Sequence, residues 1–209
     1  INYSCFSIHI IYLIFKFLIS NVSIMEYFTN DFETDCYIMY GYLEDLPVFR
    51  TTNRAKHNDG VRPISNVYGT TNFSKIANKY DIVKYRKKNP NGKGYLTKLK
   101  ENYPEYEFIF QEFMDLHGKN FKFNQIVINY NFKITKHLDA KNVGESMIIG
   151  LGDYEDGKLN IENKNGKIKS VDIKNKFYKF NGSKLFHWVD EFKGNRYSLV
   201  FYNIWNKNV

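Results

Sequence analysis

Three residues that can bind a transition metal stand at telling positions in this chain. The sequence contains 5 histidines, and one of them forms the triplet His137-Leu138-Asp139 after the apolar stretch QIVINY. Side chains two apart on an extended segment point to the same side, so His137 and Asp139 can reach one ion. His187 lies in a later apolar stretch, KLFHWV. Two imidazoles and one carboxylate on one face of a metal leave its other positions open, which is the ligand set of non-haem Fe(II) oxygenases.

An arginine and a serine follow His187 in the triplet Arg196-Tyr197-Ser198. Alternation along a strand places Arg196 and Ser198 on one face, opposite Tyr197. A guanidinium beside a hydroxyl can anchor a carboxylate through paired hydrogen bonds. Because the chain has 25 lysines and only 5 arginines, an arginine here is informative. The triplet therefore predicts a site for the distal carboxylate of a dicarboxylate.

The same residues also allow a purely structural interpretation. Asp139 and Asn142 could shape a turn, and His187, next to Trp188, could be a hydrogen-bonded histidine of the core. That interpretation leaves the position of Arg196 unexplained.

Three segments, HLDAKNVGES, IIGLGDYEDGKL and FNGSKLFHWVDEFKGNRYSLVFY, together resemble the Fe(II)/2-oxoglutarate-dependent oxygenase superfamily. The resemblance covers about residues 120–205 and is nearest to small viral or protist members that are distantly similar to the TET/JBP and AlkB enzymes. It implies a double-stranded β-helix (jelly roll), so the expected fold class is mainly β with an N-terminal helical layer.

The resemblance also implies roles and cofactors. Fe(II) would be bound by His137, Asp139 and His187, and 2-oxoglutarate by Arg196, Ser198 and Asn129. The implied reaction oxidises a substrate while 2-oxoglutarate is converted to succinate and CO₂, with ascorbate as an accessory reductant. No protein acid or base is required, so no further catalytic residue is predicted.

The pattern of the chain predicts the elements that must position these residues. A helix is expected after Pro104, which suits its first position, and before Gly118, with one apolar face formed by Tyr106, Ile109, Phe110 and Phe113. Seven short strands are expected beyond it, at 123–130, 146–151, 158–162, 168–173, 177–180, 184–189 and 197–204. Seven closely spaced strands after a helix predict an antiparallel sandwich or barrel.

Three further segments are interpreted from local sequence. Residues 35–70 are expected to form strands and loops. The dipeptide Asn181-Gly182 predicts a two-residue hairpin turn. The stretch from 81 to 100 is expected to be a loop; its basic part, 84–100, is either a solvated linker or a phosphate-contacting patch with two tyrosines for stacking.

Composition bounds the partners only weakly. Lys, Asn, Ile, Phe and Tyr make up 106 of the 209 residues, and all five have codons rich in A and T. An AT-rich genome would produce this bias without selection for function. The net charge of +8 therefore gives modest support for a nucleic-acid partner. With 4 Pro, 13 Gly and 2 Cys, collagen-like and disulfide-rich classes are excluded.

The domain organisation is expected to be simple. Residues 25–209 are predicted to form one oxygenase domain without repeats. Residues 1–24 contain an apolar run that is short for a membrane span. We interpret them as translated upstream sequence or a fragment end, with a membrane or targeting helix as the alternative. The expected location is intracellular, cytoplasmic or nuclear, in a protein that could be virus-encoded.

The substrate is open at this stage. A nucleic-acid base is favoured, a peptidyl (prolyl or lysyl) residue is the main rival, and a small molecule is a further alternative. From a different class, a non-catalytic jelly-roll binding module would retain the metal ligands without turnover.

Overall fold

The computed structural model describes residues 26–50, 62–71 and 95–204. This part of the chain contains three helices, α2 (Phe32–Asp45), α4 (Lys98–Asn102) and α5 (Tyr106–His117). Its strands are β1 (Ile64–Thr71), β2 (Tyr95–Leu96), β3 (Gln125–Tyr130), β4 (Asn142–Leu151), β5 (Tyr154–Asp156), β6 (Leu159–Glu162), β7 (Ile168–Val171), β8 (Tyr178–Phe180), β9 (Phe186–Val189), β10 (Phe192–Gly194) and β11 (Tyr197–Ile204).

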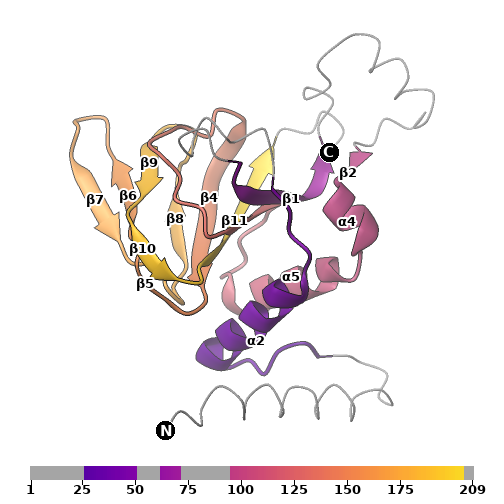
Figure 1. Ribbon diagram of the computed structural model, residues 1–209. Coiled ribbons are helices and arrows are strands. Elements are labelled where there is room, and N and C mark those ends of the chain that lie inside the picture. The colour runs from indigo at the N-terminus through magenta and orange to yellow at the C-terminus, as the bar shows by residue number, and fades with distance from the viewer. Residues whose placement is uncertain (1–25, 51–61, 72–94, 205–209) are drawn as a thin grey trace, which may run out of the picture.

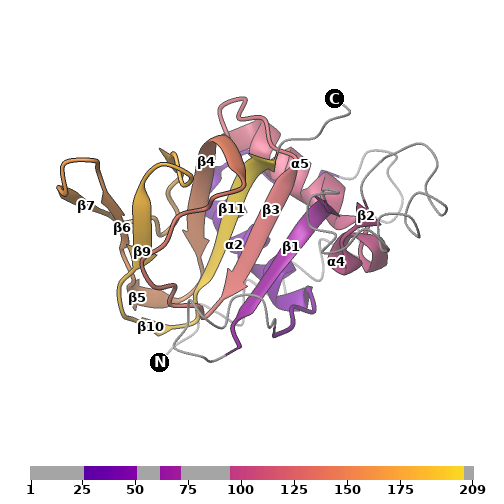
Figure 2. The same ribbon diagram turned by 90° about the horizontal axis from the view of Figure 1, so that it is seen from above.

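The strands form two principal sheets. The major sheet has the order β2-β1-β3-β11-β4-β8, the minor sheet has the order β7-β6-β9, and β5 pairs separately with β10. Figure 2 shows β4, β11, β3 and β1 lying side by side in the major sheet, with the minor sheet apart from them. All strand pairs in these sheets are antiparallel.

The chain passes back and forth between the two sheets. After β3 it crosses to the minor sheet, where His137 pairs with His187 of β9. It then contributes β4 to the major sheet, β6 and β7 to the minor, β8 to the major, β9 to the minor and β11 to the major. This alternation is the connectivity of a double-stranded β-helix, and it confirms the predicted jelly roll. The seven strands predicted beyond Gly118 are all present, with shifted ends.

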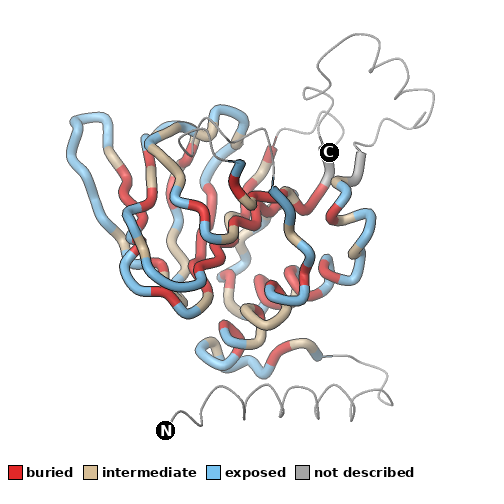
Figure 3. The backbone as a smooth tube through the Cα atoms, viewed as in Figure 1, coloured by how far each residue is buried: buried red, intermediate tan, exposed pale blue. Residues whose placement is uncertain are grey.

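A helical layer covers the outer face of the major sheet, as predicted. Figure 1 shows α2 and α5 together on one side of this sheet. The largest core cluster joins the two helices to the outward side chains of β3, β4 and β11. At its centre Leu199 lies directly opposite both Ile128 and Ile149, and all three side chains have 0% exposure. In Figure 3 the buried colour is concentrated here, whereas the β6–β7 turn is exposed.

A smaller apolar cluster fills part of the space between the sheets. It joins Ile148 of β4 and Phe180 of β8 to Leu159 and Ile161 of β6, with Ile173 from the following loop. These contacts hold the two sheets face to face and leave the rest of the interior to the side chains described below.

The prediction of strands and loops over 35–70 was wrong for its first part, because Phe32–Asp45 is the helix α2. Its start is fixed by Asp31, whose side chain accepts a hydrogen bond from the backbone N–H of Thr34. Its buried residues, Asp35, Cys36, Met39 and Leu43, do follow a helical period. Exposed and half-buried tyrosines between them obscure that period in the sequence.

Two other local predictions need correction. Asn181-Gly182 does not form a hairpin, because β8 pairs with β4 of the major sheet and β9 with β6 of the minor sheet; Gly182 also lacks the positive φ of such a turn. The stretch 84–100 is not all loop, since it ends in β2 and the start of α4. Finally, α5 begins at Tyr106, two residues after Pro104.

Residues 1–24 and 84–94 lie outside the described residues. No helix in the described ranges combines the length and the apolar character needed to cross a membrane.

Candidate functional site

His137, Asp139 and His187 converge at one place inside the barrel. Their ligand atoms all lie within 4.8 Å of one another. Asp139 Oδ1 is 3.5 Å from His137 Nε2, and Asp139 Oδ2 is 3.5 Å from His187 Nε2. The crossing segment carries the first two residues and β9 carries the third. The backbone bridge between the two histidines is what brings them together.

Both imidazoles are oriented by the same local hydrogen bond. His137 Nδ1 lies 2.9 Å from the carbonyl oxygen of Thr135, and His187 Nδ1 lies 3.0 Å from that of Leu185. A carbonyl can only accept, so each Nδ1 carries a proton and donates. In the neutral ring each Nε2 then presents a lone pair toward Asp139. Such a bond behind the ligand atom is typical of metal-binding histidines.

The Asp139 carboxylate is held from two further sides. Asn142 Nδ2 donates to Asp139 Oδ2 at 3.2 Å, and the Asp139 N–H donates to the Gly182 carbonyl at 2.8 Å. A Cβ on Gly182 would lie 2.8 Å from Asp139 Oδ2, so only glycine allows this approach. Burial acts to raise the pKa of Asp139, but hydrogen bonds and charge from His137 and His187 outweigh it and hold that pKa well below its usual range.

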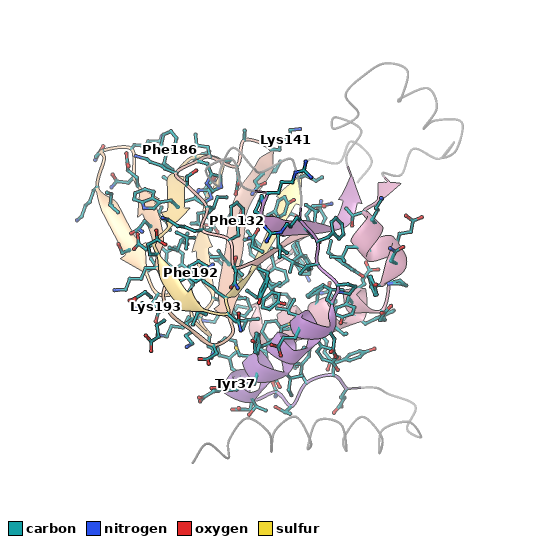
Figure 4. The ribbon with its side chains drawn as sticks, in the orientation of Figure 1. Tyr37, Phe132, Lys141, Phe186, Phe192 and Lys193 are labelled. Atoms are coloured by element: carbon teal, nitrogen blue, oxygen red, sulfur yellow. The ribbon has the colours of Figure 1, made fainter. Side chains whose placement is uncertain are left out.

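A cavity of about 70 Å³ opens beside this cluster. Its wall is mostly apolar, with polar side chains limited to the cluster, Asn142, Asn129 and Ser198. Phe132, which is 2% exposed, lines it and lies toward the middle of the molecule in Figure 4, whereas Phe186 projects at the periphery. The structure thus brings five of the six predicted site residues to one cavity, the exception being Arg196.

Asn129 and Ser198 belong to a buried polar row. Asn129 on β3 lies opposite Ser65 on β1 and opposite Ser198 on β11. Ser65 Oγ donates to Asn129 Oδ1 at 2.6 Å, and Asn129 Nδ2 donates to Ser198 Oγ at 3.1 Å. Ser65 did not emerge from the sequence, because only the β1–β3 register places it next to Asn129.

Arg196 lies behind the cavity wall, on the same strand as Ser198 but two residues earlier. Its side chain is 1% exposed, and its guanidinium carbon lies 5.3 Å from the ring centre of Tyr154 and 5.4 Å from that of Phe192. Figure 4 shows Phe192 and Lys141, two residues beyond Asp139, well apart in the barrel. As alternation predicts, Tyr197 points the other way and packs against Tyr40 of α2.

Unpaired donors gather around Arg196. Within the described residues Arg196 Nε, Arg196 Nη2 and Tyr154 Oη are buried without a hydrogen-bond partner. Burial raises the pKa of Tyr154 to about 12, despite the nearby Arg196 charge, so its hydroxyl keeps its proton. Buried polar groups are nearly always paired, and buried charges more so. Three such donors together fit an anionic group, and a carboxylate could accept from all of them.

Sequence reasoning missed Tyr154 and gave Asn142 only a structural role. Tyr154 lies on β5, and its ring reaches the interior because Gly150 has no side chain; a Cβ there would lie 2.2 Å from Tyr154 Oη. The glycines of IIGLGD were a signal of close approach that could have been followed. Asn142, three residues after Asp139, was noticed as a turn residue, but its bond to the carboxylate depends on its rotamer.

No protein-family model matches the sequence, and no curated protein does either. Solved structures with a similar fold include a 2OG-Fe(II) oxygenase family oxidoreductase from Burkholderia pseudomallei, at 20% identity over 44% of this chain and 50% of that one, with a TM-score of 0.34. A Pseudomonas putida prolyl-4-hydroxylase is 9% identical over 86% and 90% of the two chains, with a TM-score of 0.44. NgTET1 in complex with 5mC DNA is 12% identical over 78% and 68%, with a TM-score of 0.46.

The structural neighbours of this chain are therefore members of the 2OG-Fe(II) oxygenase family. The chain spans half the length of the Burkholderia protein. What this chain does has to be argued from its own site.

Proposed function

We propose that this protein is an Fe(II)- and 2-oxoglutarate-dependent dioxygenase. The observation that carries the proposal is the pairing of two features in one barrel: a His-Asp-His cluster and a buried arginine whose donors lack partners. The first suits an iron ion with open coordination positions. The second suits the distal carboxylate of a dicarboxylate.

The metal site is supported by its donor chemistry. His137 and His187 offer nitrogen lone pairs, and Asp139 offers a carboxylate that stays ionised. Asn142 and Gly182 hold that carboxylate in place. When bound, Fe(II) with 2-oxoglutarate and O₂ supplies the oxidising power, and 2-oxoglutarate leaves as succinate and CO₂. The residues of this chain would bind and orient the reactants; none would need to move a proton.

The cosubstrate site is supported by Arg196, Tyr154 and Ser198. Arg196 and Tyr154 carry the buried donors, and Ser198 lies on the cavity wall between them and the cluster. The mostly apolar wall would exclude water from the reacting centre. A non-catalytic binding module would have no use for a buried, unpaired arginine, so the enzyme is the better proposal.

An anaerobic titration tests this function. 2-Oxoglutarate is added to the Fe(II)-loaded protein while the visible absorption of the metal chelate is followed. We expect a band that saturates in the wild type and weakens in Arg196→Ala, and aerobic turnover that yields succinate. Bound iron without any such band would overturn the proposal.

For the substrate we propose a nucleic-acid base, with a peptidyl residue as the rival. The net charge of +8 supports this choice, because a polyanion is attracted to a basic protein. Binding to oligonucleotides should weaken as salt is raised, and it should be measured from low to physiological salt. No binding at low salt would turn the proposal toward a peptide.

A further inference from the structure

We propose that Ser65 is a positioning residue that sets the hydrogen-bond direction of Ser198, so that the Ser198 hydroxyl is a ready donor toward the carboxylate in the cavity. The inference rests on the proposed function, since the carboxylate is that of 2-oxoglutarate. Ser65 does not line the cavity. Its influence must therefore pass through Asn129.

The three side chains form one continuous row across three strands. Ser65, Asn129 and Ser198 are register partners, and their exposures are 5%, 8% and 4%. The row is buried, so water does not compete for its hydrogen bonds, and each bond is made within the protein. Strand pairing alone sets the order serine, amide, serine.

The chemistry of the amide gives the row a direction. An amide oxygen only accepts and an amide nitrogen only donates. Ser65 must therefore give its proton to Asn129 Oδ1, and Ser198 Oγ must accept from Asn129 Nδ2. The proton of Ser198 then has no acceptor among the described residues. Because Ser198 lies on the cavity wall, this proton is available to a ligand there.

The opposite direction would harm anion binding. If the Asn129 amide were turned over, Ser198 would donate to Asn129 Oδ1 and present only lone pairs to the cavity. A carboxylate would then meet an acceptor instead of a donor. The bond from Ser65 to Asn129 Oδ1 stabilises the favourable orientation before any ligand arrives. Such preorganisation raises affinity because the ligand does not have to reorient the site.

The register explains why the row stops at Ser198. The next partner on β4 is Gly150, which has no side chain, and its place is taken by the Tyr154 hydroxyl. That hydroxyl is itself an unpaired donor. Ser198 and Tyr154 would therefore offer donors to the same anion from neighbouring positions, and Ser65 would fix one of them.

The test is a double-mutant cycle on binding of 2-oxoglutarate to the Fe(II)-loaded full chain, by anaerobic calorimetry. We expect Ser65→Ala to weaken binding by about three- to tenfold, the worth of one hydrogen-bond preference. Ser65→Thr, which keeps the hydroxyl, should bind like the wild type. In a Ser198→Ala background, Ser65→Ala should have no further effect, because its route to the ligand is gone.

A matched control removes the same kind of bond elsewhere. Ser170 donates to Asn160 Oδ1, and Asn160 Nδ2 donates to Asp190, in a similar row that does not line the cavity. Ser170→Ala should leave the affinity for 2-oxoglutarate unchanged. Thermal unfolding of every variant separates loss of affinity from loss of folding.

The outcomes distinguish the two proposals. If the wild type binds 2-oxoglutarate and Ser65→Ala binds it equally well, the positioning role is overturned while the proposed function stands. A full Ser65→Ala effect in the Ser198→Ala background also overturns it, because the effect would not run through Ser198. If the Fe(II)-loaded wild type binds no 2-oxoglutarate, both fall together.

Discussion

The two faces of the major sheet are made by the same strands and serve different purposes. On the outer face, Ile128, Leu199 and Ile149 form a row of fully buried apolar side chains beneath α2 and α5. One residue along each strand, the inner face carries the polar row that begins with Asn129 and Ser198. Alternation of side chains makes the two rows independent in chemistry although they share a backbone.

The difference teaches how the stability and the site are separated. The outer face is closed by aromatic helices, so its free energy comes from burial of apolar surface. The inner face keeps a cavity and leaves donors of Arg196 and Tyr154 without partners. Unpaired buried donors cost stability, and proteins keep them mainly at functional sites. Mutations on the two faces should therefore affect different measurements.

The largest effect is expected at the metal cluster. Asp139→Ala should abolish turnover of 2-oxoglutarate and lower the affinity for Fe(II) by more than about 100-fold, because even residues behind a ligand account for 10- to 100-fold. Competition with a chromogenic chelator under anaerobic conditions measures this. Asp115→Ala on α5 is the control, since Asp115 only accepts from Gln111 on the same helix. Unchanged iron affinity in Asp139→Ala would remove this residue from the site.

A neighbouring pair on β11 compares the faces directly. Leu199→Ala, on the outer face, should lower the free energy of unfolding by about 2–5 kcal/mol, because it leaves a cavity in a closed core. Ser198→Ala, on the inner face, should cost much less stability but weaken 2-oxoglutarate binding. Urea unfolding and calorimetry measure the two quantities. Similar stability losses in both variants would contradict the separation of the faces.

A smaller effect is expected behind the metal cluster. Asn142→Ala removes the bond to Asp139 Oδ2 and should lower Fe(II) affinity by about 10- to 100-fold. Asn142 also donates to Ser146, so Ser146→Ala serves as the control and should change iron affinity less. Equal effects of the two variants would indicate that Asn142 acts only through the backbone turn.

The smallest effect concerns the unpaired arginine and has an unusual sign. Arg196→Met should raise the free energy of unfolding of the cofactor-free protein by about 1 kcal/mol, because it replaces a buried charge with an apolar chain of similar length. The same variant should lose affinity for 2-oxoglutarate. Urea unfolding without and with cosubstrate measures both. A loss of several kcal/mol without cosubstrate would show that Arg196 has a partner within the protein.

Part of the fold could be predicted because it depends on local pattern. The apolar face of α5 and the alternation of the later strands are visible in the sequence, since burial imposes periods of 3.6 and 2. The helix α2 was missed because tyrosines interrupt its apolar period. The Asn181-Gly182 hairpin was wrong because a local turn preference cannot tell that β8 and β9 belong to different sheets.

The sequence by itself determined the residue types and spacings that suggest iron and 2-oxoglutarate, from His137 to Ser198, because alternation and ligand chemistry are local properties. Only the tertiary structure decided how those residues meet. Ser65, Tyr154 and Asn142 enter the site through strand register, the space left by Gly150 and a side-chain rotamer, respectively. Each depends on contacts between segments distant along the chain or on side-chain packing, which a pattern of residues along one segment does not contain.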